Sequence, residues 1–177
     1  MARVPMIDGN EPELAELVNK IRSGRGGALI NVYGLLLHSP PLAETWFDHI
    51  NTVRWGTKLS GRLREIAIIR IGYLTKSAYI LNQHVPRLAV AEGMTQEECD
   101  ALEDWERSDL FSDEERAVLA FVDAMTRDIT VPDDVFAALA GHFDARRMVE
   151  LAILVGSYNS HARVLSAFEI DLEPPQS

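Results

Sequence analysis

The chain has 177 residues, of which 47% are hydrophobic and 25% are charged, and this length and balance predict one globular domain over residues 1–177. Its net charge of −10 at pH 7, without any run of basic residues, argues against partners such as nucleic acid or an anionic membrane. The single cysteine, Cys99, excludes an intramolecular disulfide, and the lack of a signal sequence or a long apolar stretch predicts a cytoplasmic protein that does not enter the membrane.

Helical periodicity recurs along the chain while alternating strand patterns are scarce, which predicts an all-α fold. Residues 1–28 are expected to hold an N-terminal helix over residues 11–22 and a glycine-rich linker. A short helix is predicted over residues 29–37. The next helix is expected to be capped by Ser39 and to end near Trp55.

Two segments, residues 63–73 and 148–158, are apolar nearly all round, which is typical of helices that are buried or lie in a subunit interface. They align with each other without gaps, so that Glu65 matches Glu150. The match is consistent with an internal helical repeat and equally with two buried helices of similar pattern.

The second half of the chain carries clear helix boundaries. Residues 95–98 and 112–115 each begin with a hydroxyl residue and end with glutamate, the pattern of a reciprocal helix cap. A helix is expected from near residue 133 to Gly141, and a last long one over residues 144–168. Residues 171–177 are predicted to form a frayed tail.

Two polar residues stand out because they interrupt apolar helices. Glu65 lies inside the apolar segment, and His84 lies in a predicted helix over residues 77–89 whose face is otherwise apolar. An unpaired buried carboxylate or imidazole costs several kcal/mol, so each is expected to have a partner or a function. Pro86 is expected to bend this helix beside His84 and to free a backbone carbonyl.

A structural interpretation competes with a catalytic one. In it, Glu65 pairs with an arginine such as Arg62 or Arg70, and His84 is a core histidine whose hydrogen bonds are satisfied. No metal site is predicted, because three other histidines show no ligand spacing to a carboxylate or to one another: His38, His49 and His142.

Five segments carry a family resemblance through their order and spacing: residues 31–43, 63–70, 79–84, 91–94 and 158–163. Together they resemble the carboxymuconolactone decarboxylase family, part of the alkyl hydroperoxidase D-like (AhpD-like) superfamily. The resemblance covers nearly all of the chain after residue 30. It implies a single-domain helical bundle of the AhpD-like type that forms a homo-oligomer, either a dimer, a trimer or a hexamer.

The peroxidase branch of this superfamily has a glutamate, two relay cysteines and a final histidine at fixed spacing. The same frame here runs from Glu65 to His84, with Ser77 and Ile80 at the two cysteine positions. Cys99 belongs to a separate helix and is poorly placed to replace them. Peroxide reduction by a thiol relay is therefore disfavoured.

The two residues of this frame that can transfer protons, Glu65 and His84, are present. The resemblance implies a lyase-like enzyme that needs no cofactor and decarboxylates or isomerises a small organic acid or lactone, with His84 as acid or base and Glu65 as its orienting partner. The alternative is an AhpD-like protein that has lost its thiol relay and acts as a ligand-binding or oligomeric interaction protein. The expected substrate-binding residues are Tyr33, Ser77, Tyr79, Ile80 and His161.

Overall fold

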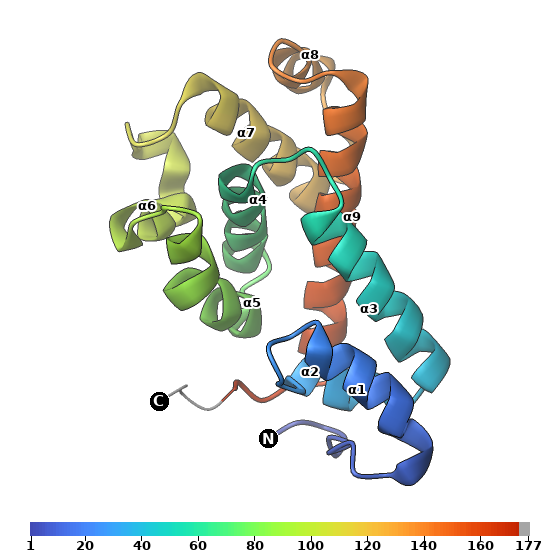
Figure 1. The fold of residues 1–177 in the computed structure, drawn as a ribbon. Helices are drawn as coiled ribbons and strands as arrows, with labels where there is room; N and C mark the ends of the chain where they lie inside the picture. The colour runs from blue at the N-terminus through green and yellow to red at the C-terminus, as the bar shows by residue number, and fades with distance from the viewer. Residues whose placement is uncertain (174–177) are drawn as a thin grey trace.

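The computed structural model describes residues 1–173, which form helices and contain no β-strand, so the all-α prediction is confirmed (Figure 1). Residues 1–173 contain nine α-helices, two 3-10 segments, η1 and η3, and one π-helical segment, η2. In chain order the elements are η1 (Pro12–Leu14), α1 (Ala15–Ser23), α2 (Asn31–Leu36), α3 (Pro40–Trp55), α4 (Gly61–Leu74), α5 (Ala78–Gln83), η2 (His84–Ala89), α6 (Gln96–Ala101), η3 (Leu102–Arg107), α7 (Asp113–Arg127), α8 (Asp133–Ala140) and α9 (Ala145–Ala167).

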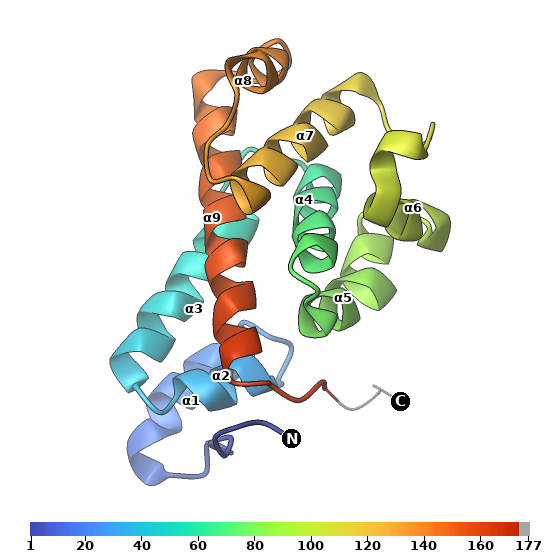
Figure 2. The same cartoon turned by 180° about the vertical axis from the view of Figure 1, so that it is seen from behind.

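Helix α4 occupies the middle of the molecule. Figures 1 and 2 show it between the long helix α9 and the pair α5 and α6, and it packs against α7, α9, α5 and η2. Every residue from Leu63 to Gly72 is buried, as expected for a helix that is apolar on all sides. None of the described helices is long and apolar enough to cross a bilayer.

Two hydrophobic clusters meet at α4, which explains why this helix has no polar face. Ile68 and Ile71 belong to the larger cluster, which α4 forms with residues of α1, α2, α3, α7 and α9. Ile66 and Ile69 belong to the smaller cluster, which also contains Cys99. Because residues on different sides of one helix serve different cores, α4 fixes the position of both.

The predicted helix starts depend on local hydrogen bonds, and most are confirmed. The capping boxes at Thr95 and Ser112 both form, and the Asp144 carboxylate caps α9 by accepting a hydrogen bond from the backbone N–H of Arg147 at 2.8 Å. Ser39 occupies the N-cap position of α3, but its side chain makes no capping hydrogen bond, so that part of the prediction is wrong.

The first residues of the predicted frayed tail, 171–173, make hydrogen bonds to the N-terminal part of the chain. Asp171 accepts a hydrogen bond from the backbone N–H of Ala2 at 3.1 Å, and Glu173 accepts one from the backbone N–H of Asn31 at 2.6 Å. Residues 174–177 lie outside the described residues. The irregular N-terminal segment and the end of α9 therefore lie at the same end of the molecule (Figure 2).

A buried ion pair connects the central helix to α7. The Arg70 guanidinium donates two hydrogen bonds of 2.6 Å to the Asp123 carboxylate and further bonds to the backbone carbonyls of Leu102 and Glu103. This bidentate geometry satisfies both charges away from water. It also shows that Arg70 is not the partner of Glu65.

We expect Asp123→Ala to lower the free energy of unfolding by about 3–5 kcal/mol, because the Arg70 guanidinium would then be buried without its counter-ion. Urea denaturation of both proteins at pH 7 measures the loss. Arg127→Ala is the matched control, since Arg127 contacts the same carboxylate at 3.5 Å from an exposed position and should cost less than about 1 kcal/mol. Equal small losses in the two variants would contradict this account.

Candidate functional site

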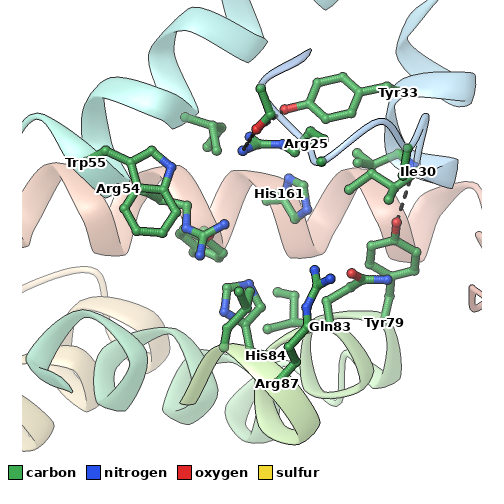
Figure 3. Close-up of a pocket in the computed structure, with 18 residues that line it drawn as sticks. Arg25, Ile30, Tyr33, Arg54, Trp55, Tyr79, Gln83, His84, Arg87 and His161 are labelled. Carbon is green, nitrogen blue, oxygen red and sulfur yellow. Dashed lines mark hydrogen bonds between the residues drawn. The ribbon is translucent and has the colours of Figure 1, made fainter. Parts of the chain in front are cut away.

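A pocket of about 280 Å³ lies between α9, α3, α5, η2 and the loop that follows α1 (Figure 3). Its wall combines apolar side chains, among them Ile30, Ile50 and Ile80, with polar and charged groups. The polar and charged residues that line it are Arg25, Tyr33, Arg54, Tyr79, Gln83, His84, Arg87, Tyr158 and His161.

The centre of the site is a hydrogen-bonded pair between His84 and Glu65. The His84 Nδ1 atom lies 2.6 Å from Glu65 Oε2, and the two residues are only 5% and 1% exposed. His84 lines the pocket, whereas Glu65 lies behind it on the buried helix α4. The structure thus brings together Glu65 and His84, the two polar residues that the sequence analysis singled out within apolar helices.

The backbone around His84 departs from the single helix predicted over residues 77–89. Helix α5 ends at Gln83, and the chain continues as the π-helical segment η2, which contains Pro86. A proline has no N–H to complete the regular helical ladder, and a π-helical turn is a common way to accommodate such an interruption. His84 is the first residue of η2, so the interruption sets the direction of its ring.

Two arginines hold the other oxygen of the Glu65 carboxylate. Arg64 Nε lies 3.2 Å and Arg54 Nη2 lies 3.5 Å from Glu65 Oε1. Both guanidinium groups also stack on the Trp55 ring, each 4.5 Å from its centroid. The expected pairing of Glu65 with Arg62 or Arg70 is therefore wrong, although the idea of an arginine partner was sound.

Arg62 serves a different part of the fold. Its guanidinium donates to Glu98 and Glu115, both at 2.6 Å, and so connects α4 to the two capping boxes. Two residues further along the helix, Arg64 points in another direction and contacts Glu65 instead. Neighbouring arginines on one helix thus have separate structural roles because they project in different directions.

These contacts decide the protonation of the pair. Burial alone would raise the pKa of Glu65, but His84, Arg54 and Arg64 lower it to about 2, so the carboxylate is ionised. Burial lowers the pKa of His84, against the opposing effect of Glu65. An ionised carboxylate only accepts hydrogen bonds, so a neutral His84 donates its Nδ1–H to Glu65. The Nε2 atom then carries the lone pair, and within residues 1–173 it has no hydrogen-bond partner.

Tyr158 and His161, both on α9, complete the polar side of the pocket. The Tyr158 ring meets His84 edge-on at 5.5 Å, and burial raises the pKa of the Tyr158 phenol to about 12, so it is uncharged at neutral pH. His161 lies between the Arg25 and His84 sides of the pocket in Figure 3. The pocket therefore holds two imidazoles from different helices.

Four of the five expected substrate-binding residues line the pocket: Tyr33, Tyr79, Ile80 and His161. Ser77 does not, because its hydroxyl caps α5 by accepting a hydrogen bond from the backbone N–H of Ile80. The Tyr79 hydroxyl is already engaged, since it donates to Glu173 at 2.7 Å. Ser77 thus lies at the start of α5 and has a capping role there.

Sequence patterns did not identify Arg25, Arg54 and Tyr158 as pocket residues. Arg54 lies near the end of α3 and resembles any surface arginine in the sequence, yet it is 8% exposed. Arg25 lies in the glycine-rich linker and donates to the Tyr33 hydroxyl at 2.9 Å. With Arg87 they place three guanidinium groups around the pocket of an acidic protein.

Cys99 lies away from this pocket. It is fully buried in the smaller hydrophobic cluster, where burial and neighbouring acidic residues raise the pKa of its thiol to about 11. A thiol with such a pKa is almost entirely protonated at neutral pH and is a poor nucleophile. In the part of the chain that the structure describes, no three histidine, cysteine or acidic side chains gather as a metal site would require.

Comparison with known proteins finds a family match over part of the chain. Residues 40–124 match the model of the carboxymuconolactone decarboxylase family. The uncharacterized protein YnjA of Escherichia coli (strain K12) is 45% identical over 71 residues, which are 40% of this chain and 39% of YnjA. The chain thus spans well under half the length of this relative.

Solved structures of low sequence identity share the fold across nearly the whole chain. An uncharacterized peroxidase-related protein from Silicibacter sp. TM1040 superposes with a TM-score of 0.83 at 20% identity, covering 97% of this chain and 92% of that one. An alkylhydroperoxidase AhpD core protein from Ralstonia eutropha JMP134 gives 0.81 at 18% identity, covering 99% and 93%. The predicted AhpD-like bundle is therefore confirmed, and with one cysteine the chain has no relay pair.

Replacement of Glu65 tests the electrostatic account of the pair. We expect Glu65→Gln to lower the pKa of His84 below its wild-type value, because the carboxylate that favours the imidazolium is gone while Arg54 and Arg64 remain. The His84 ring would then stay neutral to a lower pH. Titration of the histidine side chains by NMR measures the change.

Glu92→Gln is the control for this measurement. Glu92 accepts a hydrogen bond from Arg64 at 2.7 Å but has no contact with His84, so its removal should move the His84 titration much less. A His84 pKa that rises in Glu65→Gln, or that moves equally in the two variants, would contradict the proposed coupling.

Proposed function

Since residues 40–124 belong to the carboxymuconolactone decarboxylase family, we propose that this chain is a cofactor-independent acid–base enzyme that decarboxylates or isomerises a small organic acid or lactone. His84 is the acid or base, and Glu65 is its positioning residue. The observation that carries the proposal is the 2.6 Å contact between the buried Glu65 carboxylate and the pocket-lining His84 ring. A carboxylate that orients an imidazole is a recurrent arrangement in acid–base catalysis.

Isomerisation follows directly from a neutral His84. Its Nε2 lone pair removes a proton from a carbon next to a carbonyl group, the C–H electron pair becomes a carbon–carbon double bond, and the carbonyl π pair moves to oxygen. Glu65 stabilises the imidazolium that forms. Return of the proton to a different carbon completes the isomerisation and restores the neutral ring.

Decarboxylation uses the same groups in the opposite protonation state. Loss of carbon dioxide from a carboxylate placed β to a carbonyl, or conjugated with it, leaves the electron pair as an enolate. A protonated His84 then delivers its proton to carbon. In either reaction His84 handles one proton and Glu65 remains ionised.

The charges of the pocket support an anionic substrate. Arg25, Arg54 and Arg87 line it, whereas the chain as a whole carries a net charge of −10. Field lines from like charges concentrate in a cavity with apolar walls, so these guanidinium groups favour an organic anion there. The apolar residues Ile30 and Ile80 suit its hydrocarbon part.

We expect His84→Ala to lower kcat/KM by at least about 100-fold on whichever member of a panel of lactones and keto acids the wild type converts. Glu65→Gln should cost less, about 10-fold or more, because it disturbs the orientation of His84 and leaves the ring in place. His142→Ala is the control, since His142 is exposed and lies outside the pocket.

Equal turnover by wild type and His84→Ala would remove the proposal. Binding of panel compounds by a wild type that converts none of them would favour the alternative of a ligand-binding protein without a relay. Peroxide consumption that requires Cys99 would contradict both, because the buried thiol lies outside the pocket.

We also propose that the chain acts as a homo-oligomer, at least a dimer, in the cytoplasm. On α9, Val149 and Ile153 lie one turn apart and are 62% and 50% exposed, although this segment is as apolar as α4. We expect light scattering at micromolar concentration to give more than the monomer mass of 19.8 kDa. Val149→Glu combined with Ile153→Glu should shift the mass toward the monomer, and a monomeric wild type would contradict this proposal.

A further inference from the structure

His161 is a second imidazole in the pocket, expected from the sequence to bind substrate, and the acid–base chemistry of His84 and Glu65 leaves its chemical role open. It lies on α9, three residues after Tyr158 and on the same side of that helix. Its ring lines the same pocket as His84 (Figure 3). The side chain is half-buried, and among the described residues no hydrogen bond reaches either of its ring nitrogens.

Aromatic packing, and not hydrogen bonding, fixes the orientation of this ring. His161 stacks on Trp46 with ring centroids 5.7 Å apart and an interplanar angle of 17°. On another side it meets the Tyr158 ring at 5.7 Å and 48°. A ring that is held by its faces and edges keeps its polar atoms available, so both nitrogens can serve a bound molecule.

The surroundings of His161 keep it uncharged. Burial is the main cause that lowers its pKa to about 3, and the neighbouring His84, Arg25 and Arg54 act in the same direction. Within residues 1–173 no carboxylate forms a hydrogen bond or an ion pair with it, in contrast to His84 with Glu65. At neutral pH the ring therefore offers one N–H donor and one acceptor.

We propose that His161 is a second catalytic residue, whose neutral N–H donates a hydrogen bond to the carbonyl oxygen of the substrate where negative charge develops. This inference rests on the proposed function, because the charge arises when His84 takes the proton from carbon and the carbonyl π pair moves to oxygen. The oxygen stays unprotonated and hydrogen-bonded to His161 until the pair returns to carbon.

The arrangement explains why one pocket contains two differently supported imidazoles. His84 has an ionised carboxylate behind it and can accept a proton. His161 lies against the rings of Trp46 and Tyr158 and near the guanidinium groups of Arg25 and Arg54, so it remains a donor throughout. A neutral donor that is already in place stabilises an enolate without having to reorient during the reaction. The implied substrate class is a small carbonyl compound with an acidic C–H next to, or conjugated with, the carbonyl group.

4-Nitrophenol is a suitable probe, because its phenolate form carries a conjugated oxyanion like that of an enolate and its absorbance reports its ionisation. We expect the wild type to bind 4-nitrophenolate at about pH 8 and His161→Phe, which keeps a ring against Trp46, to bind it about tenfold more weakly. His161→Gln retains an N–H donor and should recover most of the lost affinity. His142→Phe should bind like the wild type.

A spectroscopic readout separates a direct contact from a structural effect. Binding of the probe should shift the imidazole nitrogen signals of His161 in the NMR spectrum of the wild type and leave those of His142 in place. Equal affinity of His161→Phe and wild type, failure of the wild type to bind the probe, or an unmoved His161 signal would each overturn the inference.

His84→Gln distinguishes this inference from the proposed function. If His84→Gln loses turnover while His161→Phe keeps full affinity for the probe, the acid–base proposal stands and the role of His161 falls. If His161→Phe loses affinity while His84→Gln keeps turnover, the proposed function falls and the anion contact of His161 is supported.

Discussion

The buried carboxylate of Glu65 is the constraint on which the arrangement of the site depends. An ionised group that is 1% exposed is tolerated only if it is surrounded by hydrogen-bond donors and positive charge. Arg54 from α3, Arg64 from α4 and His84 from η2 supply them. Three elements must therefore meet at one point, and the position of the His84 ring is set by the same contacts that compensate the charge.

The π-helical segment that follows α5 also determines the position of the His84 ring. A regular helix through residues 77–89 would fix the direction of every side chain by its period, whereas the π-helical segment η2 changes that direction at His84. Pro86 makes the change favourable, because it cannot complete the regular ladder. The irregular backbone therefore occurs at the residue whose ring must contact Glu65 and also line the pocket, His84.

The electrostatics of the pocket differ from those of the whole molecule. Acidic residues dominate the chain, but Arg25, Arg54 and Arg87 surround the cavity, and these arginines come from segments far apart in the sequence. The two imidazoles of the cavity respond differently to this environment, because only His84 has a carboxylate neighbour. One small cavity therefore provides a proton acceptor and a neutral donor, the combination on which the proposed chemistry draws.

The features that could be predicted from the sequence alone are those that depend on interactions between residues close together in the chain. The capping boxes at Thr95 and Ser112 close within three residues, and the apolar surround of Glu65 follows from one helical segment, so patterns in the sequence were sufficient for both. Only the tertiary structure decided that Glu65 pairs with Arg54 and Arg64. Which of several arginines reaches a buried carboxylate depends on the rotation and packing of whole helices against one another, and no sequence spacing encodes that geometry.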